Sequence, residues 1–168
     1  VIDEIGERAI EVALQAKDAD KSTEVVVLTM GPAGAKDVLT KGLQMGADSA
    51  VHVIDDALAG ADMTRTATVL AAAIRRLSPD LVVGDFRVSL GISAEVAKVP
   101  YAAVTNAYWS PATALQFPMP EHPIERTFGL RVFAALFTVV RPLTFKLYLR
   151  PFNALRRRYG LTPLSNLF

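Results

Sequence analysis

The sequence predicts a protein of the α/β class, in which a parallel sheet of about four strands is flanked by helices and followed by a helical C-terminal tail. Short apolar runs alternate with helix-length segments through the first two-thirds of the chain. The run EVVVLTM at residues 24–30 is rich in β-branched residues, which is typical of a strand covered on both faces. Of the 168 residues, 51% are apolar, which is enough to fill a core.

Each element has its own signal in the sequence. Residues 4–17 place Ile5, Ala9 and Val12 on one face at helical spacing, and Gly46 is suited to end the next helix, expected at residues 35–45. The further elements expected are helices at residues 35–45, 62–77, 89–98, 127–140 and 143–158, strands at 50–54, 81–84 and 101–105, and a proline-rich loop at 109–123. Because helix-length crossovers separate the strands, we expect them to form one parallel sheet.

The composition changes abruptly near Gly84. Residues 1–84 contain no aromatic residue and residues 85–168 contain all of them; the first half has thirteen acidic and eight basic residues, and the second has four and ten. A domain that evolved as one unit rarely has such a boundary in its composition. We therefore expect two halves, residues 1–84 and 85–168, joined in one composite domain.

Composition also excludes several kinds of site. The chain has no cysteine and only two histidines, His52 and His122, so no metal site is expected. The apolar stretch at residues 132–140 is too short for a membrane span, and no signal-peptide pattern precedes the first helix, so we expect a cytoplasmic protein. The arginines at 156–158, with Arg150 and Tyr159, could contact phosphates of a nucleic acid or a lipid, but a short basic run at a helix end is more often solvated, and that is the interpretation preferred here. The aromatic residues of the tail are expected to leave apolar surface exposed, with self-association as the consequence.

Three segments of the first half occur in an order that is specific to one family: DEIGERAIEVALQ, EVVVLTMGPAGAKDVLTKGLQMGADSAVHVID and ALAGADMTRTATVLAAAIRRLSPDLVV. Residues 1–83 therefore resemble the β subunit of electron transfer flavoproteins. The resemblance implies a Rossmann-like nucleotide-binding fold that holds AMP, and FAD bound only together with a partner α-type subunit. It implies a cofactor site at Asp3, Met30, Gly31 and Pro32.

The flavoprotein pattern is incomplete in this chain. DEIGER begins at residue 3, so the strand that precedes it in the family is not expected here, and GDFRVSLG stands where the family has the loop that wraps the nucleotide phosphates. The family often has Asn at the position of Asp3, where a carboxylate would face a phosphate less favourably. We therefore expect AMP to bind weakly or not at all.

The segments PDLVVGDFRVSLGISAEVAKVPYAAVTNAYWSP, FPMPEHP and PFNALRRRYGLTPL in residues 79–168 resemble the acceptor-side domain of GT-B nucleotide-sugar glycosyltransferases. The resemblance places Asp85 where that family has the Asp that steadies a general-base His. Residues 1–51 contain no His, and no donor domain is present, so Asp85 is a catalytic relic at best. Alternatively, Asp85 caps the turn that follows its strand.

Three hypotheses remain open from the sequence. The chain is a nucleotide-binding-type domain related to the flavoprotein β subunit without complete activity, a non-catalytic fragment of a GT-B glycosyltransferase, or a chimeric structural domain with no ligand. The expected partner is a flavoprotein α-type subunit or a second copy of the chain.

Overall fold

The computed structural model describes residues 4–105 and 129–165. The chain divides into two compact units, Val1–Thr105 and Asn106–Phe168. The predicted loop at residues 109–123 lies outside the described residues, as do Asp3 and His122.

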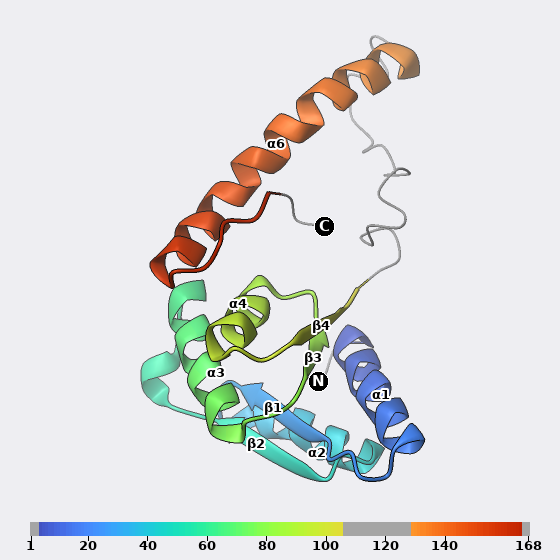
Figure 1. Ribbon diagram of the computed structural model, residues 1–168, viewed down its shortest axis with the longest axis vertical. Coiled ribbons are helices and arrows are strands. Elements are labelled where there is room, and N and C mark those ends of the chain that lie inside the picture. Colours follow the sequence, from blue (N-terminus) through green and yellow to red (C-terminus); the bar gives the residue numbers. More distant parts are fainter. Residues whose placement is uncertain (1–3, 106–128, 166–168) are drawn as a thin grey trace. The chain divides into compact units, whose positions relative to one another are not determined.

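The first unit alternates helices and strands as the sequence predicts (Figure 1). Its elements are α1 (Glu4–Ala19), β1 (Val26–Met30), η1 (Ala33–Ala35), α2 (Lys36–Met45), β2 (Ser49–Val53), η2 (Asp56–Leu58), α3 (Met63–Leu77), β3 (Val82–Asp85), α4 (Val88–Ala97) and β4 (Tyr101–Val104). The predicted α/β class with flanking helices is thereby confirmed. Helix α1 packs against α2, and α3 packs against α4.

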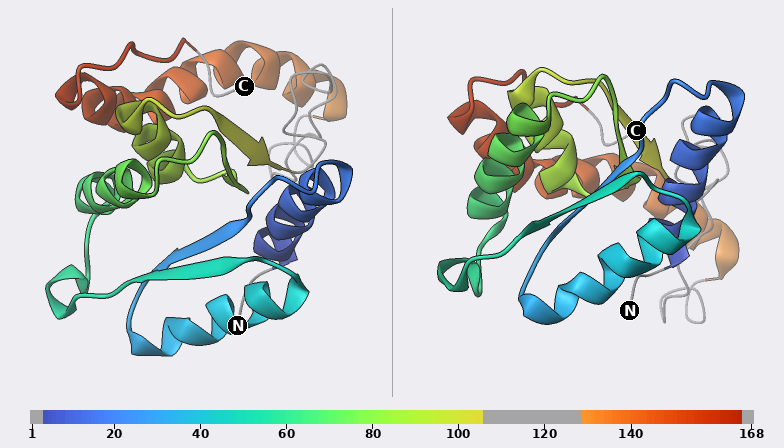
Figure 2. Two further views of the ribbon diagram at one scale, coloured as in Figure 1. Left: turned by 60° about the horizontal axis from the view of Figure 1, so that its bottom comes forward. Right: turned by 90° about the horizontal axis from the view of Figure 1, so that it is seen from below.

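The strands form two separate parallel pairs instead of the single sheet that was predicted. Strand β1 pairs with β2, Leu28 lying opposite Val51, and β3 pairs with β4, Gly84 lying opposite Ala103. Figure 2 shows the two pairs from two directions. The prediction of about four strands in one sheet was wrong because, among the described residues, no strand joins β1 to β3. Helix α1 instead lies against β3 and β4.

The core beside β1 and β2 is small and closely packed. Val25 and Val27 are buried together with Leu39 and Ala47, and apolar residues of α1 pack against them. A Cβ at Gly42 would lie 2.9 Å from Cγ1 of Val27, so the glycine allows α2 to approach β1 closely.

The segment LQMGAD closes this half of the unit. Gly46 ends α2 with a φ of 122°, a conformation that suits glycine. The Asp48 carboxylate then accepts a hydrogen bond of 2.8 Å from the backbone N–H of Val25, and it also pairs with Lys17 at the end of α1. The same lysine donates to the carbonyl of Gly46 at 3.2 Å. The motif therefore fastens α1 to the turn between α2 and β2.

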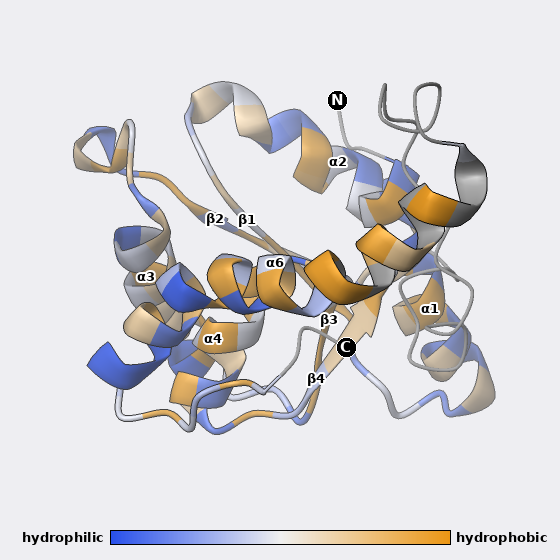
Figure 3. Ribbon diagram, turned by 90° about the horizontal axis from the view of Figure 1, so that it is seen from above, coloured by the Kyte–Doolittle hydropathy of each residue, from blue (hydrophilic) through white to orange (hydrophobic). Residues whose placement is uncertain are grey.

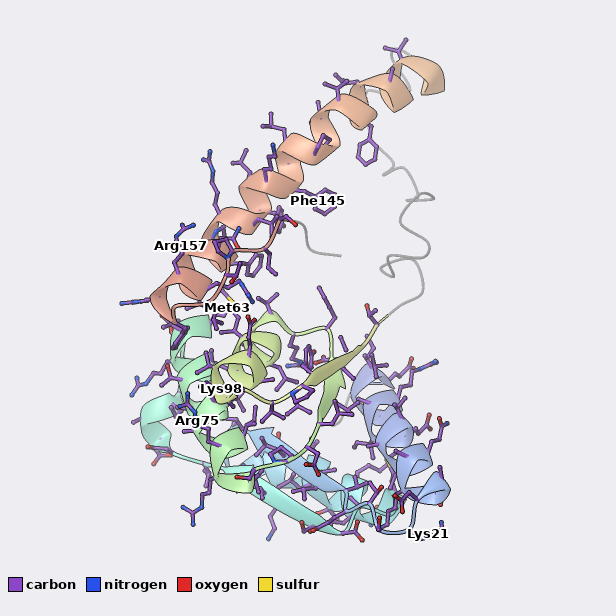
Figure 4. All side chains as sticks on the ribbon, in the orientation of Figure 1. Lys21, Met63, Arg75, Lys98, Phe145 and Arg157 are labelled. Atoms are coloured by element: carbon purple, nitrogen blue, oxygen red, sulfur yellow. The ribbon has the colours of Figure 1, made fainter. Side chains whose placement is uncertain are left out.

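Helices α3 and α4 join the two compositional halves of the sequence. Ala67, Ala71 and Ile74 of α3 are buried, as are Ile92 and Ala94 of α4. Two hydrogen bonds cross this contact: the hydroxyl of Ser93 donates to the carbonyl of Ala67 at 3.1 Å, and Arg75 donates to the carbonyl of Val96 at 2.7 Å. Figure 4 shows Arg75 on α3 near Lys98 at the end of α4. Packing in this unit thus continues across the boundary at residue 84.

The described part of the second unit, residues 129–165, holds one long helix, α6 (Leu130–Arg158), where two helices separated by Pro142 were predicted. Pro142 and Pro151 both lie inside α6. A proline removes one backbone hydrogen bond and bends a helix without always ending it, which explains the error. After Gly160, the chain returns along the last turns of α6, where Asn153 exchanges two hydrogen bonds with Leu164, of 3.0 and 2.8 Å (Figure 1).

Candidate functional site

The candidate cofactor residues Met30, Gly31 and Pro32 lie at the carboxyl end of β1, the edge at which open α/β sheets bind ligands. The N–H of Gly31 donates to the carbonyl of Val53 at 3.1 Å, and Nε2 of His52 lies 3.0 Å from the carbonyl oxygen of Gly31. Both backbone groups of Gly31 are therefore engaged within the protein. Pro32 has no N–H to offer.

Two backbone donors follow at the same turn. The carbonyl of Pro32 accepts from Ala35 at 2.8 Å, and no protein acceptor in the described part of the chain takes the N–H groups of Ala33 and Gly34. A Cβ at Gly34 would meet no atom within 4 Å, so the turn is open to solvent there. Lys36, the first residue of α2, is exposed beside it. Two free amides and an ammonium group form a small anion-attracting turn.

Two carboxylates follow β2 in the segment that leads to α3. Asp55 accepts a hydrogen bond of 2.8 Å from the N–H of Ala57, and Asp62 accepts one of 2.8 Å from the N–H of Arg65 at the start of α3. Gly60, Ala61, Asp62, Thr64 and Arg65 line an open depression of about 530 Å³. Both carboxylates serve as caps, Asp55 of η2 and Asp62 of α3.

Asp85 lies at the carboxyl end of β3 and is paired with a neighbour in its own turn. Nε of Arg87 donates to both carboxylate oxygens of Asp85, at 2.8 and 2.7 Å. The backbone carbonyl of Asp85 accepts from the N–H of Arg87 at 2.6 Å and from the hydroxyl of Tyr101. Burial raises the pKa of Tyr101, which keeps this hydroxyl protonated as a donor.

The described residues do not assemble an acid–base pair around Asp85. His52 is on β2, in the other strand pair, and its ring faces the carbonyl of Gly31. The carboxylate of Asp85 faces a guanidinium group instead of an imidazole. In residues 4–105 and 129–165, no group of three or more His, Asp or Glu side chains is placed to hold a metal ion.

Sequence reasoning missed one contributor to the edge beside β1, the ring of His52. His52 could have been found from the strand register, because it lies opposite Thr29, two residues before Gly31.

Comparison with known proteins gives matches of two kinds. The family model of the electron transfer flavoprotein domain matches residues 1–116. An "Inactive PGL/p-HBAD biosynthesis glycosyltransferase" of Mycobacterium bovis (strain BCG / Pasteur 1173P2) is 48% identical over 106 residues, which cover 61% of this chain and 29% of the relative. A "PGL/p-HBAD biosynthesis glycosyltransferase" of Mycobacterium tuberculosis (strain ATCC 25177 / H37Ra) has the same identity over the same length, which is 25% of that relative.

A "PGL/p-HBAD biosynthesis rhamnosyltransferase" of Mycobacterium bovis BCG is 49% identical over 89 residues, covering 53% of this chain and 20% of the relative. The chain thus spans less than a third of the length of these curated relatives. No solved structure matches. The matches confirm both resemblances expected from the sequence. The two matched regions overlap, because their lengths of 116 and 106 residues together exceed the 168 residues of the chain.

Proposed function

Because the chain belongs to the electron transfer flavoprotein domain family, we propose that its first unit is a nucleotide-binding-type domain that holds the phosphate of AMP weakly at the turn after β1. This chain has no complete activity on its own. Any FAD would be bound together with a partner α-type subunit, as the family resemblance implies.

One observation supports this proposal above the others: the open turn at Ala33 and Gly34 has two unengaged backbone N–H groups beside the ammonium group of Lys36. Phosphates are commonly held by backbone amides at the turn between a parallel strand and the next helix. The turn directly follows the segment MGP at residues 30–32, which carries the flavoprotein resemblance.

The same turn explains why the affinity is low. The N–H of Gly31 is already bound to Val53, so one of the donors that would face the ligand is lost. The carboxylate of Asp55 lies just after β2, the strand paired with β1, and repels a phosphate dianion at this edge. We therefore expect a dissociation constant for AMP in the high-micromolar range or weaker.

Titration calorimetry of the full chain with AMP tests the proposal. Gly34→Val should abolish detectable binding, because the new side chain covers the two amides, and Lys36→Gln should weaken it several-fold. Asp55→Asn keeps the capping bond but removes the charge, so it should tighten binding. Lys41→Gln, an exposed lysine on the same helix, is the matched control and should change nothing. A low-micromolar constant, or binding indifferent to Gly34→Val and Lys36→Gln, would contradict the proposal.

A second candidate function is that of a non-catalytic, acceptor-side fragment of a glycosyltransferase. It is favoured by the identity of 48% to relatives named as glycosyltransferases, one of which is named inactive. The pairing of Asp85 with Arg87 leaves no described base to activate an acceptor hydroxyl. We expect no sugar transfer from UDP- or TDP-sugars, and a turnover that disappears on Asp85→Asn would refute this.

A further inference from the structure

Helix α6 exposes an apolar stripe along one face. Val132, Leu136, Val139, Leu143 and Leu147 recur every three or four residues, so their side chains lie in one row. Val139 is 72% exposed and Leu143 is 61% exposed. The row extends for about 22 Å along the helix. Figure 3 shows the hydrophobic colouring along α6. Single exposed apolar residues are ordinary on a protein surface, but five in one row indicate a surface that binds an apolar partner.

The charge of α6 has one sign only. The helix contains Lys146 and the arginines at positions 131, 141, 150, 156, 157 and 158, and it contains no Asp or Glu. Lys146, Arg150, Arg157 and Arg158 are exposed. Arg150 and Arg157 follow Leu143 at intervals of seven residues, so the helical period places them on the same side of the helix as the apolar row.

We propose that α6 binds in the plane of an anionic lipid bilayer, with the row from Val132 to Leu147 in the acyl boundary and the arginines against lipid phosphates. An apolar row with adjoining cations is the pattern of helices that lie on membranes. None of the helices described in residues 4–105 and 129–165 is long and apolar enough to cross a bilayer. The proposal is independent of the nucleotide site, because it concerns a different unit of the chain.

The charge of α6 favours an anionic membrane over a second copy of the chain as its binding partner. Two α6 helices packed row to row in parallel would bring the exposed Lys146, Arg150 and Arg157 of each copy together, and α6 has no carboxylate to pair them. A bilayer that contains anionic lipids supplies the apolar contact and the opposite charge at the same surface. The one-sided charge therefore selects the membrane over self-association.

Flotation of the full chain with vesicles tests the proposal. Vesicles of phosphatidylcholine mixed equally with phosphatidylglycerol should bind the chain, and vesicles of phosphatidylcholine alone should bind it far less. Arg150→Gln/Arg157→Gln/Arg158→Gln should weaken binding on the order of 100-fold, since each cation near an anionic surface contributes roughly five-fold. Val139→Ser/Leu143→Ser should also weaken binding, while leaving the helical circular dichroism unchanged because both side chains are exposed.

The matched control is Lys41→Gln/Arg65→Gln/Arg76→Gln, which removes three exposed cations from the first unit and should leave vesicle binding intact. Equal binding to neutral and anionic vesicles, an equal loss in the control, or no binding at all would overturn the proposal. So would a dimer in sedimentation velocity that Val139→Ser/Leu143→Ser dissociates, because the row would then be an interface between two copies.

Discussion

In the first unit, α3 and α4 bury Ala71, Ile74 and Ile92 until 2% or less of each residue is exposed, whereas α6 leaves Val139 and Leu143 largely in solvent. Both regions are helical and rich in apolar residues. Among the leucines of α6 whose side chains the structure describes, those that are buried, Leu149 and Leu155, lie toward its C-terminal end. The difference shows that helix formation and core formation are separable in this chain. Stability should therefore depend on the first unit, and surface binding on α6.

Removing a buried methyl-rich side chain is the strongest test of this difference. Ile92→Ala in α4 should lower the free energy of unfolding by about 3 kcal/mol, because it leaves a cavity between α3 and α4. Val139→Ala in α6 should change it by less than about 0.5 kcal/mol. Urea unfolding followed by circular dichroism measures both. Equal losses would mean that α6 shares a packed core after all.

Hydrogen exchange should separate the two regions at the backbone. Amides of residues 130–147 in α6 should exchange on the order of 100-fold faster than those of β1 and β2, since few buried contacts oppose local opening of the helix. Mass spectrometry of peptic fragments resolves the two regions. Uniform protection in a monodisperse monomer would show that the chain packs as one unit and that the compositional boundary near Gly84 has no energetic meaning.

A single glycine tests how closely the first unit is packed. Gly42→Ala places a Cβ 2.9 Å from Val27, so the gain in helix propensity should be exceeded by the displacement of α2 from β1, with a net loss of about 1 kcal/mol. Gly34→Ala meets no neighbour within 4 Å and should be close to neutral. A stabilising Gly42→Ala would show that α2 can shift freely and that this core is loose.

The sequence predicted the helices and strands of the first unit well, because periodicity and turn residues such as Gly46 act locally. It could not predict the division of the sheet, since pairing between β1 and β3 depends on a neighbour that no local pattern reveals. The continuity of α6 through Pro142 was missed because a proline bends a helix as readily as it ends one. At the candidate site, Gly31 and Pro32 lie at the carboxyl edge of β1, but the pairing of Asp85 with Arg87 depends on side-chain geometry. The binding roles of Gly31, Pro32 and Asp85 stay predictions.

Lowering the pH should change the stability of the first unit but not the helicity of α6. This is the smallest of the effects that we expect. The hydrogen bond from Lys17 and then that from the N–H of Val25 lower the pKa of Asp48 from its usual 3.8. A carboxyl group whose pKa is lowered by folding stabilises the folded state above its unfolded pKa, and this contribution is lost as the pH falls through the folded value. The first unit should therefore lose stability below about pH 4. Helix α6 has no carboxylate, so its helicity should not fall over the same pH range.

Asp48→Asn isolates this contribution from those of Asp18 and Asp20, whose pKa values are also lowered, by Lys21 and Ser22 respectively. The variant should be less stable than the parent at pH 7 and should approach it below pH 4, since the parent carboxyl group is then protonated as well. Urea unfolding between pH 2.5 and 7 measures the difference at each pH. Parallel curves over this whole range would mean that Asp48 does not fasten α1 to the turn after α2, and that the first unit is held together by its apolar contacts alone.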